Sequence, residues 1–475
     1  MLGRPDPEVV PVPESTPLAG PLPPADAEAL RGLAGGAIHL PGDPLYDEAR
    51  MPWNLQVDEH PAAVAYPADP HEVSRIVRAA AASGLRVAPQ GTGHGAPPLA
   101  GRLGDAVLLK TSAMTGLRVD AAGRTARAEA GVLWGDVVAR AGRVGLAGQH
   151  MSSPGVGVIG SSLGGGVSWY SRQHGLQCSA VTAVELVLAD GTFVRATEDQ
   201  DADLLWAARG GSGGFGVVTA LEFDLLPVRT AYAGMLAWDW RHAQRVLTAW
   251  GEWTADAPES VTSVARIFQV PDIEWLPGQL RARKMVMLDA VVLGDPDAGA
   301  RAIAPLRALR PEVDTFAEMP AAEVAHLQLD PQEPTAVYAN SVLVEGFPAS
   351  AVDALVAAAG PGSGSNLLFV ELRQLGGALA RPSPRGGALD HLPAAFLVLG
   401  VGLDVGTGWD AVRADALRIL DSLAPWSSRA SYLSMAYEAA ARRGFAAAAY
   451  ERLVRIRESA DPNQLFVAPR AAAHD

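Results

Sequence analysis

The sequence has one cysteine, Cys178, among 475 residues. A single thiol can form no intrachain disulfide and cannot supply a thiolate metal cage. The ten histidines are scattered, with no HExxH motif and no other close ligand pair, so no metal site is predicted. We expect Cys178 to be a small buried residue.

Positive charge and long apolar runs are also scarce. Lys and Arg number 38 against 52 Asp and Glu, a net charge of −14, which disfavours a nucleic-acid partner. No apolar stretch is long enough to cross a bilayer. Residues 1–25 are proline-rich and lack the pattern of a secretory signal, so they are predicted to form a disordered arm. These features predict a cytoplasmic protein without membrane partners, and they leave its oligomeric state open.

Folded patterning begins near residue 26 with a β-α-β unit. Buried strands are predicted at 63–66 and 86–89. Between them, Asp69 is a candidate N-cap, Pro70 suits the first helical position, and Gly84 ends the helix.

Glycine is abundant in three loops of the first half of the chain. The loops are QGTGHGA (90–96), SPGVGVIGSSLGGGVSWYSRQHGL (153–176) and RGGSGGFGVVT (209–219). One such loop would be read as a tight turn, but three beside predicted strands favour a cradle for a nucleotide's phosphates. The chain has no GxxxxGK[ST] motif, which argues against a P-loop. Its GxGxxG-like stretches also lack the strand, helix and acidic residue of a Rossmann site.

The pattern of predicted secondary structure changes near residue 229. Strands at 284–293, 366–372 and 396–403 alternate with alanine-rich helices, which predicts a second α+β domain. The tryptophan-rich stretch 238–253 could stack on a sugar, although helix packing is the preferred interpretation. A last helical stretch is predicted at 438–459, with a break at Gly444.

Several of these motifs together resemble one known family. They are PGDPLYDEARMPWN (41–54), the segment 61–73, RVAPQGTGHGA (86–96), AGVLWGDV (130–137), VGVIGSSLGGGVSWYSRQHGL (156–176), DLLWAARGGSGGFGVVT (203–219) and DPNQLF (461–466). In order and spacing the chain is similar to FAD-linked oxidoreductases of the vanillyl-alcohol-oxidase type, in the berberine-bridge-enzyme-like branch. The motifs cover nearly the whole chain after the arm.

The resemblance implies an α+β fold with a two-subdomain, PCMH-type FAD-binding domain. That domain would span 26–228 and be completed by 435–475. A substrate-binding domain at 229–434 would contain a large antiparallel sheet with helices behind it.

The resemblance also implies FAD bound covalently, through a bond from His94 to the 8α-methyl carbon of the flavin. A histidine with a pKa of about 6.5 is largely neutral near pH 7, as this addition requires. Ser153 stands where some relatives place a cysteine that forms a second link, so a single link is predicted. The implied cofactor-binding residues are Gly91, Thr92, Gly93 and Gly95 at the pyrophosphate, Val158, Gly160, Leu163, Gly164 and Gly165 at the flavin or its phosphate arm, and Val217 on the adenine side.

By the same resemblance, the reaction is removal of a hydride from a C–H next to O or N of a small organic substrate, with O2 reduced to H2O2. Tyr432 and Glu371 are the candidate catalytic residues, and Tyr338 and His391 are weaker candidates. Ser434 replaces an asparagine of the family motif after Tyr432, and Glu371 could instead pair with a nearby arginine such as Arg373.

Three alternatives remain open from the sequence. They are a flavin dehydrogenase with another electron acceptor, a flavin-binding scaffold with non-redox activity, and a plain nucleotide-binding module. No motif in the second domain indicates the substrate.

Overall fold

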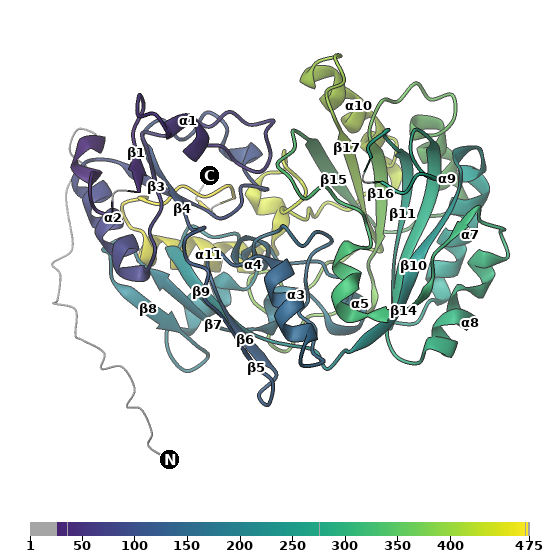
Figure 1. Ribbon diagram of the computed structural model, residues 1–475, viewed down its shortest axis with the longest axis horizontal. Coiled ribbons are helices and arrows are strands. Elements are labelled where there is room, and N and C mark those ends of the chain that lie inside the picture. The colour runs from purple at the N-terminus through teal and green to yellow at the C-terminus, as the bar shows by residue number, and fades with distance from the viewer. Residues whose placement is uncertain (1–25, 36, 275, 471, 474–475) are drawn as a thin grey trace.

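The computed structural model describes residues 26–35, 37–274, 276–470 and 472–473. The predicted arm at 1–25 lies outside this part of the chain. Three β-sheets organise the protein, two small ones in one half of the molecule and a large one in the other (Figure 1). Within the described ranges, no helix combines the length and the apolar character needed to cross a membrane.

The first small sheet contains the predicted β-α-β unit. Its strand order is β1-β2-β4-β3, parallel except for the β1–β2 pair. The helix between β2 and β3 begins as predicted, because Asp69 accepts a hydrogen bond from the Glu72 N–H at 2.8 Å and Pro70 occupies the first turn. The elements are β1 (Ile38–His39), β2 (Ala63–Ala65), α2 (Pro70–Ala82), β3 (Arg86–Gln90) and β4 (Ala106–Lys110).

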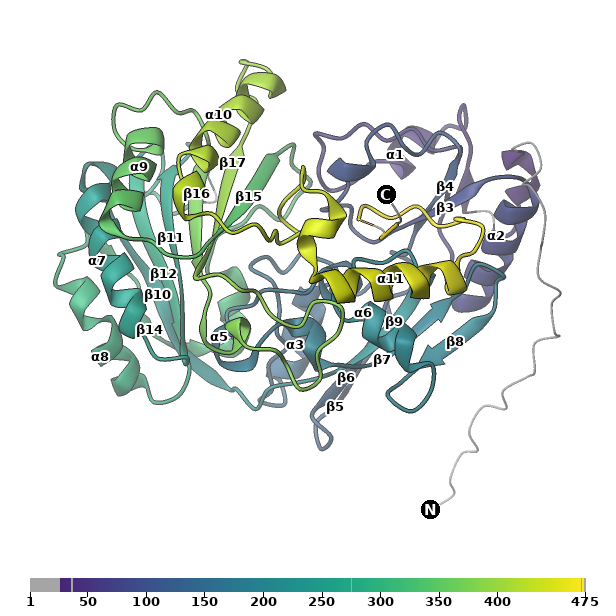
Figure 2. The same cartoon turned by 180° about the vertical axis from the view of Figure 1, so that it is seen from behind.

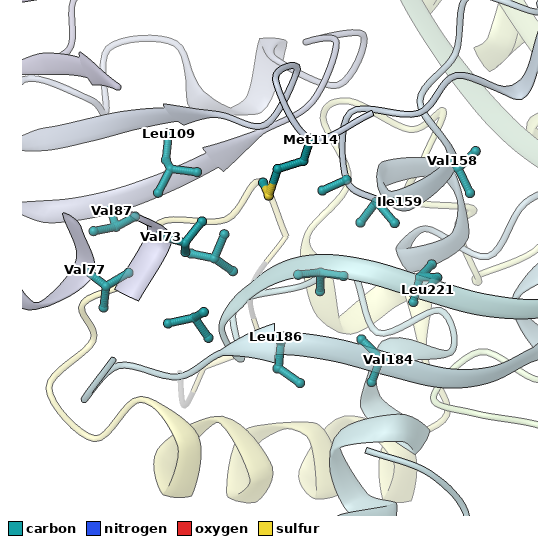
Figure 3. Packing of buried hydrophobic residues seen from close by; sticks show 14 of the residues in the cluster. Val73, Val77, Val87, Leu109, Met114, Val158, Ile159, Val184, Leu186 and Leu221 are labelled. Atoms are coloured by element: carbon teal, nitrogen blue, oxygen red, sulfur yellow. The ribbon is translucent and has the colours of Figure 1, made fainter. Parts of the chain in front are cut away.

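The second small sheet is antiparallel, in the order β5-β6-β9-β7-β8. Its strands are β5 (Leu117–Asp120), β6 (Thr125–Glu129), β7 (Val181–Val187), β8 (Phe193–Ala196) and β9 (Val217–Asp224). A continuous hydrophobic core joins this sheet to α2 and the first sheet. Figure 3 shows Val87 and Leu109 of the first sheet on one side of it, and Leu186 and Leu221 of the second on the other. The two sheets therefore fold as one unit.

Shorter helices connect and cover these sheets. They are α1 (Tyr46–Ala49), α3 (Trp134–Gly142), α4 (Val158–Leu163), α5 (Ser171–His174) and α6 (Ala202–Ala208). Single 3-10 turns occur at η1 (Ala27–Leu30), η2 (Pro97–Leu99), η3 (Gln177–Ala180), η4 (Trp240–His242), η5 (Ala321–His326), η6 (Gly377–Ala380), η7 (Ala424–Trp426) and η8 (Ala441–Gly444).

The large sheet is eight-stranded and antiparallel, in the order β13-β10-β12-β11-β16-β17-β15, with β14 also paired to β10. Its strands are β10 (Thr230–Asp239), β11 (Val261–Gln269), β12 (Lys284–Val292), β13 (Val313–Asp314), β14 (Ala317–Pro320), β15 (Tyr338–Val344), β16 (Phe369–Gln374) and β17 (Phe396–Gly402). This sheet confirms the predicted α+β fold with a large antiparallel sheet.

Four helices pack on one face of the large sheet (Figure 1). They are α7 (Ala243–Asp256), α8 (Pro296–Arg307), α9 (Ala349–Ala359) and α10 (Trp409–Asp421). The tryptophans of 238–253 serve this packing: Trp238 and Trp250 are buried in the core, and the Trp253 indole N–H donates to the Ala302 carbonyl at 2.9 Å. The sheet's other face turns toward the two small sheets.

The C-terminal segment returns to the small sheets. Figure 2 shows α11 (Ala447–Ala460) running back across that half of the molecule. Beyond it, the Val87 N–H donates to the Leu465 carbonyl at 2.8 Å and the Val467 N–H donates to the Val87 carbonyl at 2.8 Å. The last part of the chain therefore adds a short parallel bridge to the open edge of β3. The helix predicted from residue 438 begins only at Ala447.

Candidate functional site

The loop that follows β3 carries the predicted cofactor histidine. Gly93 has φ +83°, and a Cβ at this position would lie 2.7 Å from Cβ of Pro52, so only glycine suits it. A Cβ on Gly95 would meet no atom within 4 Å. Within the described part of the chain, none of the backbone N–H groups of residues 91–95 donates a hydrogen bond. The loop therefore offers a run of free donors, as a phosphate cradle requires.

His94 is half-buried, and its imidazole is electrically neutral near pH 7. Burial lowers its pKa from 6.5 to about 4. Nδ1 lies 2.7 Å from Oγ1 of Thr92, whereas Nε2 is buried without a hydrogen-bond partner in the structure. The ring stacks on Trp53 with centroids 4.0 Å apart and planes 11° apart. An unpartnered polar atom of this kind is costly in a finished core, and its presence suits a site that a ligand completes.

The second glycine loop lies against the first. A Cβ on Gly157 would be 3.6 Å from Cγ2 of Thr92, so the two loops are neighbours. Val158 and Leu163 begin and end α4, and a Cβ on Gly160 between them would meet no atom within 4 Å. Gly160, like Gly95, therefore faces open space.

Gly164 and Gly165 differ from Gly160, because the C-terminal half of the chain packs against them. A Cβ on Gly164 would collide with the Ser434 side chain, and a Cβ on Gly165, which has φ +106°, would lie 2.8 Å from Leu389 and 3.4 Å from Tyr432. Their lack of a side chain is explained by this close packing.

The third glycine loop reaches the second through the Ser212 N–H, which donates to the Leu163 carbonyl at 2.8 Å. A Cβ on Gly213 would meet only Leu163, at 4.0 Å. Val217, at the start of β9, is fully buried in the core between the small sheets. Its side chain serves packing, which leaves only its backbone for the predicted adenine contact.

Tyr432 is buried beside these loops. Its hydroxyl accepts a hydrogen bond from the Gly166 N–H at 3.1 Å, and burial raises its pKa above 10. The phenol therefore keeps its proton at neutral pH. Ser434, two residues on, donates to the Gly164 carbonyl at 2.8 Å.

Glu371 lies on the face of the large sheet opposite the helices, within a cluster of buried charges. Its carboxylate accepts hydrogen bonds from Arg373 Nε and from Gln328 Nε2, the latter at 2.9 Å. The predicted alternative, a pair with Arg373, is present. Arg373 Nη2 also lies 3.4 Å from Ser152 Oγ, which joins the cluster to the second glycine loop.

The same cluster extends along β11 and β12. Arg266 Nη2 donates to Asp289 Oδ2 at 2.6 Å, and both side chains are almost fully buried. Burial raises the pKa of Asp289 to about 6 and raises that of Asp330 from its ordinary value. A small cavity lies where this cluster meets the FAD-binding unit. It is lined by Ser152, Val167, Ser168, Trp169, Thr262, Val264, Gln328, Arg373 and Gln374.

The remaining sequence candidates have local partners. Tyr338 donates to Glu438 at 2.8 Å, and His391 pairs with Asp390 at 2.5 Å. Ser153 is buried, with Oγ 3.4 Å from the Gly155 N–H. Cys178 is buried as predicted, with Sγ 3.4 Å from the Leu389 carbonyl.

Two residues near His94 went unnoticed in the sequence. Trp53 covers the imidazole, and the hydroxyl of Tyr437 donates to the His94 carbonyl at 3.3 Å. Trp53 stands in the motif at 41–54, whereas Tyr437 lies outside the motifs quoted above. No local pattern indicates a contact across 41 or 343 positions.

Comparison with known proteins agrees with this geometry. Residues 61–197 match the FAD binding domain family. (R)-6-hydroxynicotine oxidase of Paenarthrobacter nicotinovorans is 31% identical over 204 residues, which is 43% of this chain and 44% of that protein. Xylooligosaccharide oxidase of Thermothelomyces thermophilus is 33% identical over 211 residues, 42% of each. The matched region thus spans less than half of these two relatives.

Solved structures share the whole fold at low identity. BBE-like 1 of Physcomitrella patens has a TM-score of 0.82 at 20% identity, covering 94% of this chain and 99% of that one. 6-Hydroxy-D-nicotine oxidase of Arthrobacter nicotinovorans has a TM-score of 0.80 at 22% identity, covering 92% and 98%. The resemblance predicted from the motifs is confirmed: the chain carries an FAD binding domain and has the fold of the berberine-bridge-enzyme-like FAD-linked oxidoreductases.

Proposed function

We propose that the protein is an FAD-dependent oxidase of small organic molecules, with its flavin attached covalently through His94 alone. The observation that carries the proposal is the state of His94. The imidazole is neutral and half-buried, its buried Nε2 atom has no partner, and the backbone donors of its loop have no acceptor within the described residues. A neutral imidazole is the form able to add to carbon, and free N–H groups are the form able to bind a pyrophosphate.

The three glycine loops supply the cofactor contacts in this proposal. The backbone of Gly91, Thr92, Gly93 and Gly95 holds the pyrophosphate. Gly160 and its neighbours let the cofactor approach the main chain closely, since nothing else occupies the space beside that glycine. Ser153 offers no thiolate, so no second link forms.

FAD, when bound, supplies the hydride acceptor for the substrate's C–H bond. The chain's own part is to orient the substrate and to accept the proton from its oxygen or nitrogen. We propose Glu371 for the proton, because it is a buried carboxylate in the cluster that joins the second glycine loop. Tyr432, which keeps its proton, is proposed as a hydrogen-bonding partner of the substrate's heteroatom.

The names of the relatives indicate the type of bond that is oxidised. The names of the two relatives specify a hydroxynicotine and a xylooligosaccharide, which contain C–H bonds next to nitrogen or oxygen. We propose a substrate with the same kind of bond and O2 as the electron acceptor. A cytoplasmic location remains a prediction from the sequence.

The test is to purify the protein with FAD, precipitate it in acid and record the spectrum of the pellet. Flavin absorbance should remain with the wild-type pellet and be absent from that of His94→Ala. An alcohol and amine panel followed by peroxide release then tests the reaction. Flavin reduced by a substrate but reoxidised slowly in air would contradict the oxidase and favour the dehydrogenase.

A further inference from the structure

A five-residue segment that carries no part of the proposed chemistry lies directly over the His94 loop. The Trp53 N–H donates to the Thr92 carbonyl at 2.9 Å, and Pro52 fills the place where Gly93 lacks a side chain. The indole of Trp53 then covers the imidazole in a near-parallel stack. Residues 51–55 therefore form a cover on the loop, which we call the 51–55 cover.

Both halves of the molecule hold this cover in place. On the side of the small sheets, Lys110 Nζ donates to the Met51 carbonyl at 2.9 Å. On the side of the large sheet, the Thr335 N–H donates to the Trp53 carbonyl at 3.0 Å, and Asn54 Nδ2 donates to the Val337 carbonyl at 3.0 Å. Trp53 is thus positioned by contacts that are independent of His94.

The stack and the Thr92 contact together determine the orientation of the imidazole. The Trp53 face fixes the plane of the ring, and Thr92 Oγ1 beside Nδ1 fixes its rotation within that plane. We propose that Trp53 is a positioning residue for covalent flavin attachment, which holds the His94 ring in the orientation needed for the bond to form. This inference rests on the proposed function, because it assumes that His94 is the attachment residue.

Attachment joins an imidazole nitrogen to the 8α carbon. One hydrogen leaves the methyl group, one leaves the neutral imidazole, and the electron pair passes through the flavin to O2, which becomes H2O2. Bond formation needs the nitrogen lone pair aimed at the carbon, so a ring that turns freely reacts more slowly. The indole also excludes water from the ring, which helps to keep the imidazole neutral.

The experiment measures attachment directly. Full-length protein produced under riboflavin limitation is mixed with FAD in air, and covalent flavin is followed over time by fluorescence on denaturing gels. Trp53→Met keeps an apolar side chain but removes the flat face, and it should slow attachment by about tenfold. Trp53→Phe restores a smaller face and should recover most of the rate. The control is Trp253→Leu, which removes a tryptophan from α7 in the half of the molecule with the large sheet. This variant should attach flavin at the wild-type rate.

The pH profile separates positioning from general stability. Wild-type attachment should be level from pH 8 down to about 5, because the imidazole stays neutral, whereas in Trp53→Met it should decline below about pH 6.5 as water reaches the ring. The inference would be overturned if Trp53→Met and Trp53→Phe both attached flavin at the wild-type rate and if that rate did not change with pH in either variant. If wild-type protein itself carried no covalent flavin, the proposed attachment would fail instead, so the two failures are distinguishable.

Discussion

Two polar regions of this protein differ in how their groups are partnered. Around His94, the buried Nε2 of the imidazole and the backbone N–H groups of residues 91–95 have no hydrogen-bond partner within the described residues. Around Arg373, the guanidinium and the carboxylate of Glu371 hold each other, and Gln328 and Ser152 extend the network. The first region therefore offers free groups to a ligand. In the second region Arg266 Nε and Asp289 Oδ1 also lack partners, but its charged side chains are paired with one another, so a change there should reduce folding stability.

Breaking the Arg373 cluster should give the largest effect. Arg373→Met leaves Glu371 without the cation that it pairs with in a buried setting, and removing one partner of a buried pair costs about 3–5 kcal/mol. Urea unfolding of the variant and the wild type measures the loss. Arg381→Met, which breaks an exposed pair with Glu259, is the control and should leave the free energy of unfolding close to that of the wild type. If both variants lost the same free energy of unfolding, the buried Arg373 pair would contribute no more to stability than the exposed Arg381 pair.

Acid should act in opposite directions on two buried titratable groups, His150 and Asp289 of the Arg373 cluster. His150, fully buried in the FAD-binding unit, has its pKa lowered by burial to about 4, so the unfolded chain binds more protons between about pH 4 and 6.5. The difference between these two pKa values lowers the free energy of unfolding by about 3 kcal/mol as the pH falls through this range. Asp289 has a folded pKa raised to about 6, so its cost to stability is relieved by the same acidification.

Hydrogen exchange at pH 7 and pH 5 would compare the regions within one molecule. The amides of Ala147 and Leu226, which pair with each other beside His150, should lose protection at pH 5 relative to those of β12, which carries Asp289. His150→Gln should reduce that loss and leave β12 unchanged. A uniform response of all strands would argue that these two groups do not govern the pH dependence.

Gly93→Ala should affect both stability and cofactor attachment. The residue needs φ +83° and would bring its Cβ to 2.7 Å from Pro52, so a loss of about 1–3 kcal/mol is expected together with little covalent flavin. Thermal unfolding and the acid-precipitation assay measure the two effects. Gly95→Ala, beside open space, should be close to wild type in stability.

Gly160→Ala should have the smallest effect on stability, and it tests whether the cofactor lies beside this glycine. The apoprotein should be as stable as the wild type or up to about 1 kcal/mol more stable, because alanine favours the helix and no atom lies in the way. FAD should bind about tenfold more weakly, since the added methyl group enters space proposed for the cofactor. Titration of apoprotein with FAD checks this. Unchanged affinity would place the cofactor elsewhere.

The glycine loop around His94 can be recognised in the sequence because its residues are contiguous and because Gly93 needs φ +83°, which favours glycine. The role of these residues in cofactor binding stays a prediction. The Arg373 region was foreseen only as a single pair. Arg266, Asp289 and Glu371 meet through the registers of β11, β12 and β16, which no local pattern specifies.

The boundary of the last helix shows the same limit. Alanine-rich residues from 438 favour a helix, but the chain there passes so close to Leu433 that Gly444 has no room for a side chain. Tertiary packing overrides the local propensity, and α11 begins at Ala447.

The parallel bridge between β3 and residues 465–467 bears on the timing of cofactor loading. β3 leads straight into the His94 loop, yet its outer edge is paired only by a segment more than 370 positions later in the chain. Synthesis must therefore pass residue 467 before that edge can close. We expect flavin capture to follow this closure, because in a nascent chain halted earlier the strand that precedes the imidazole would lack its outer partner.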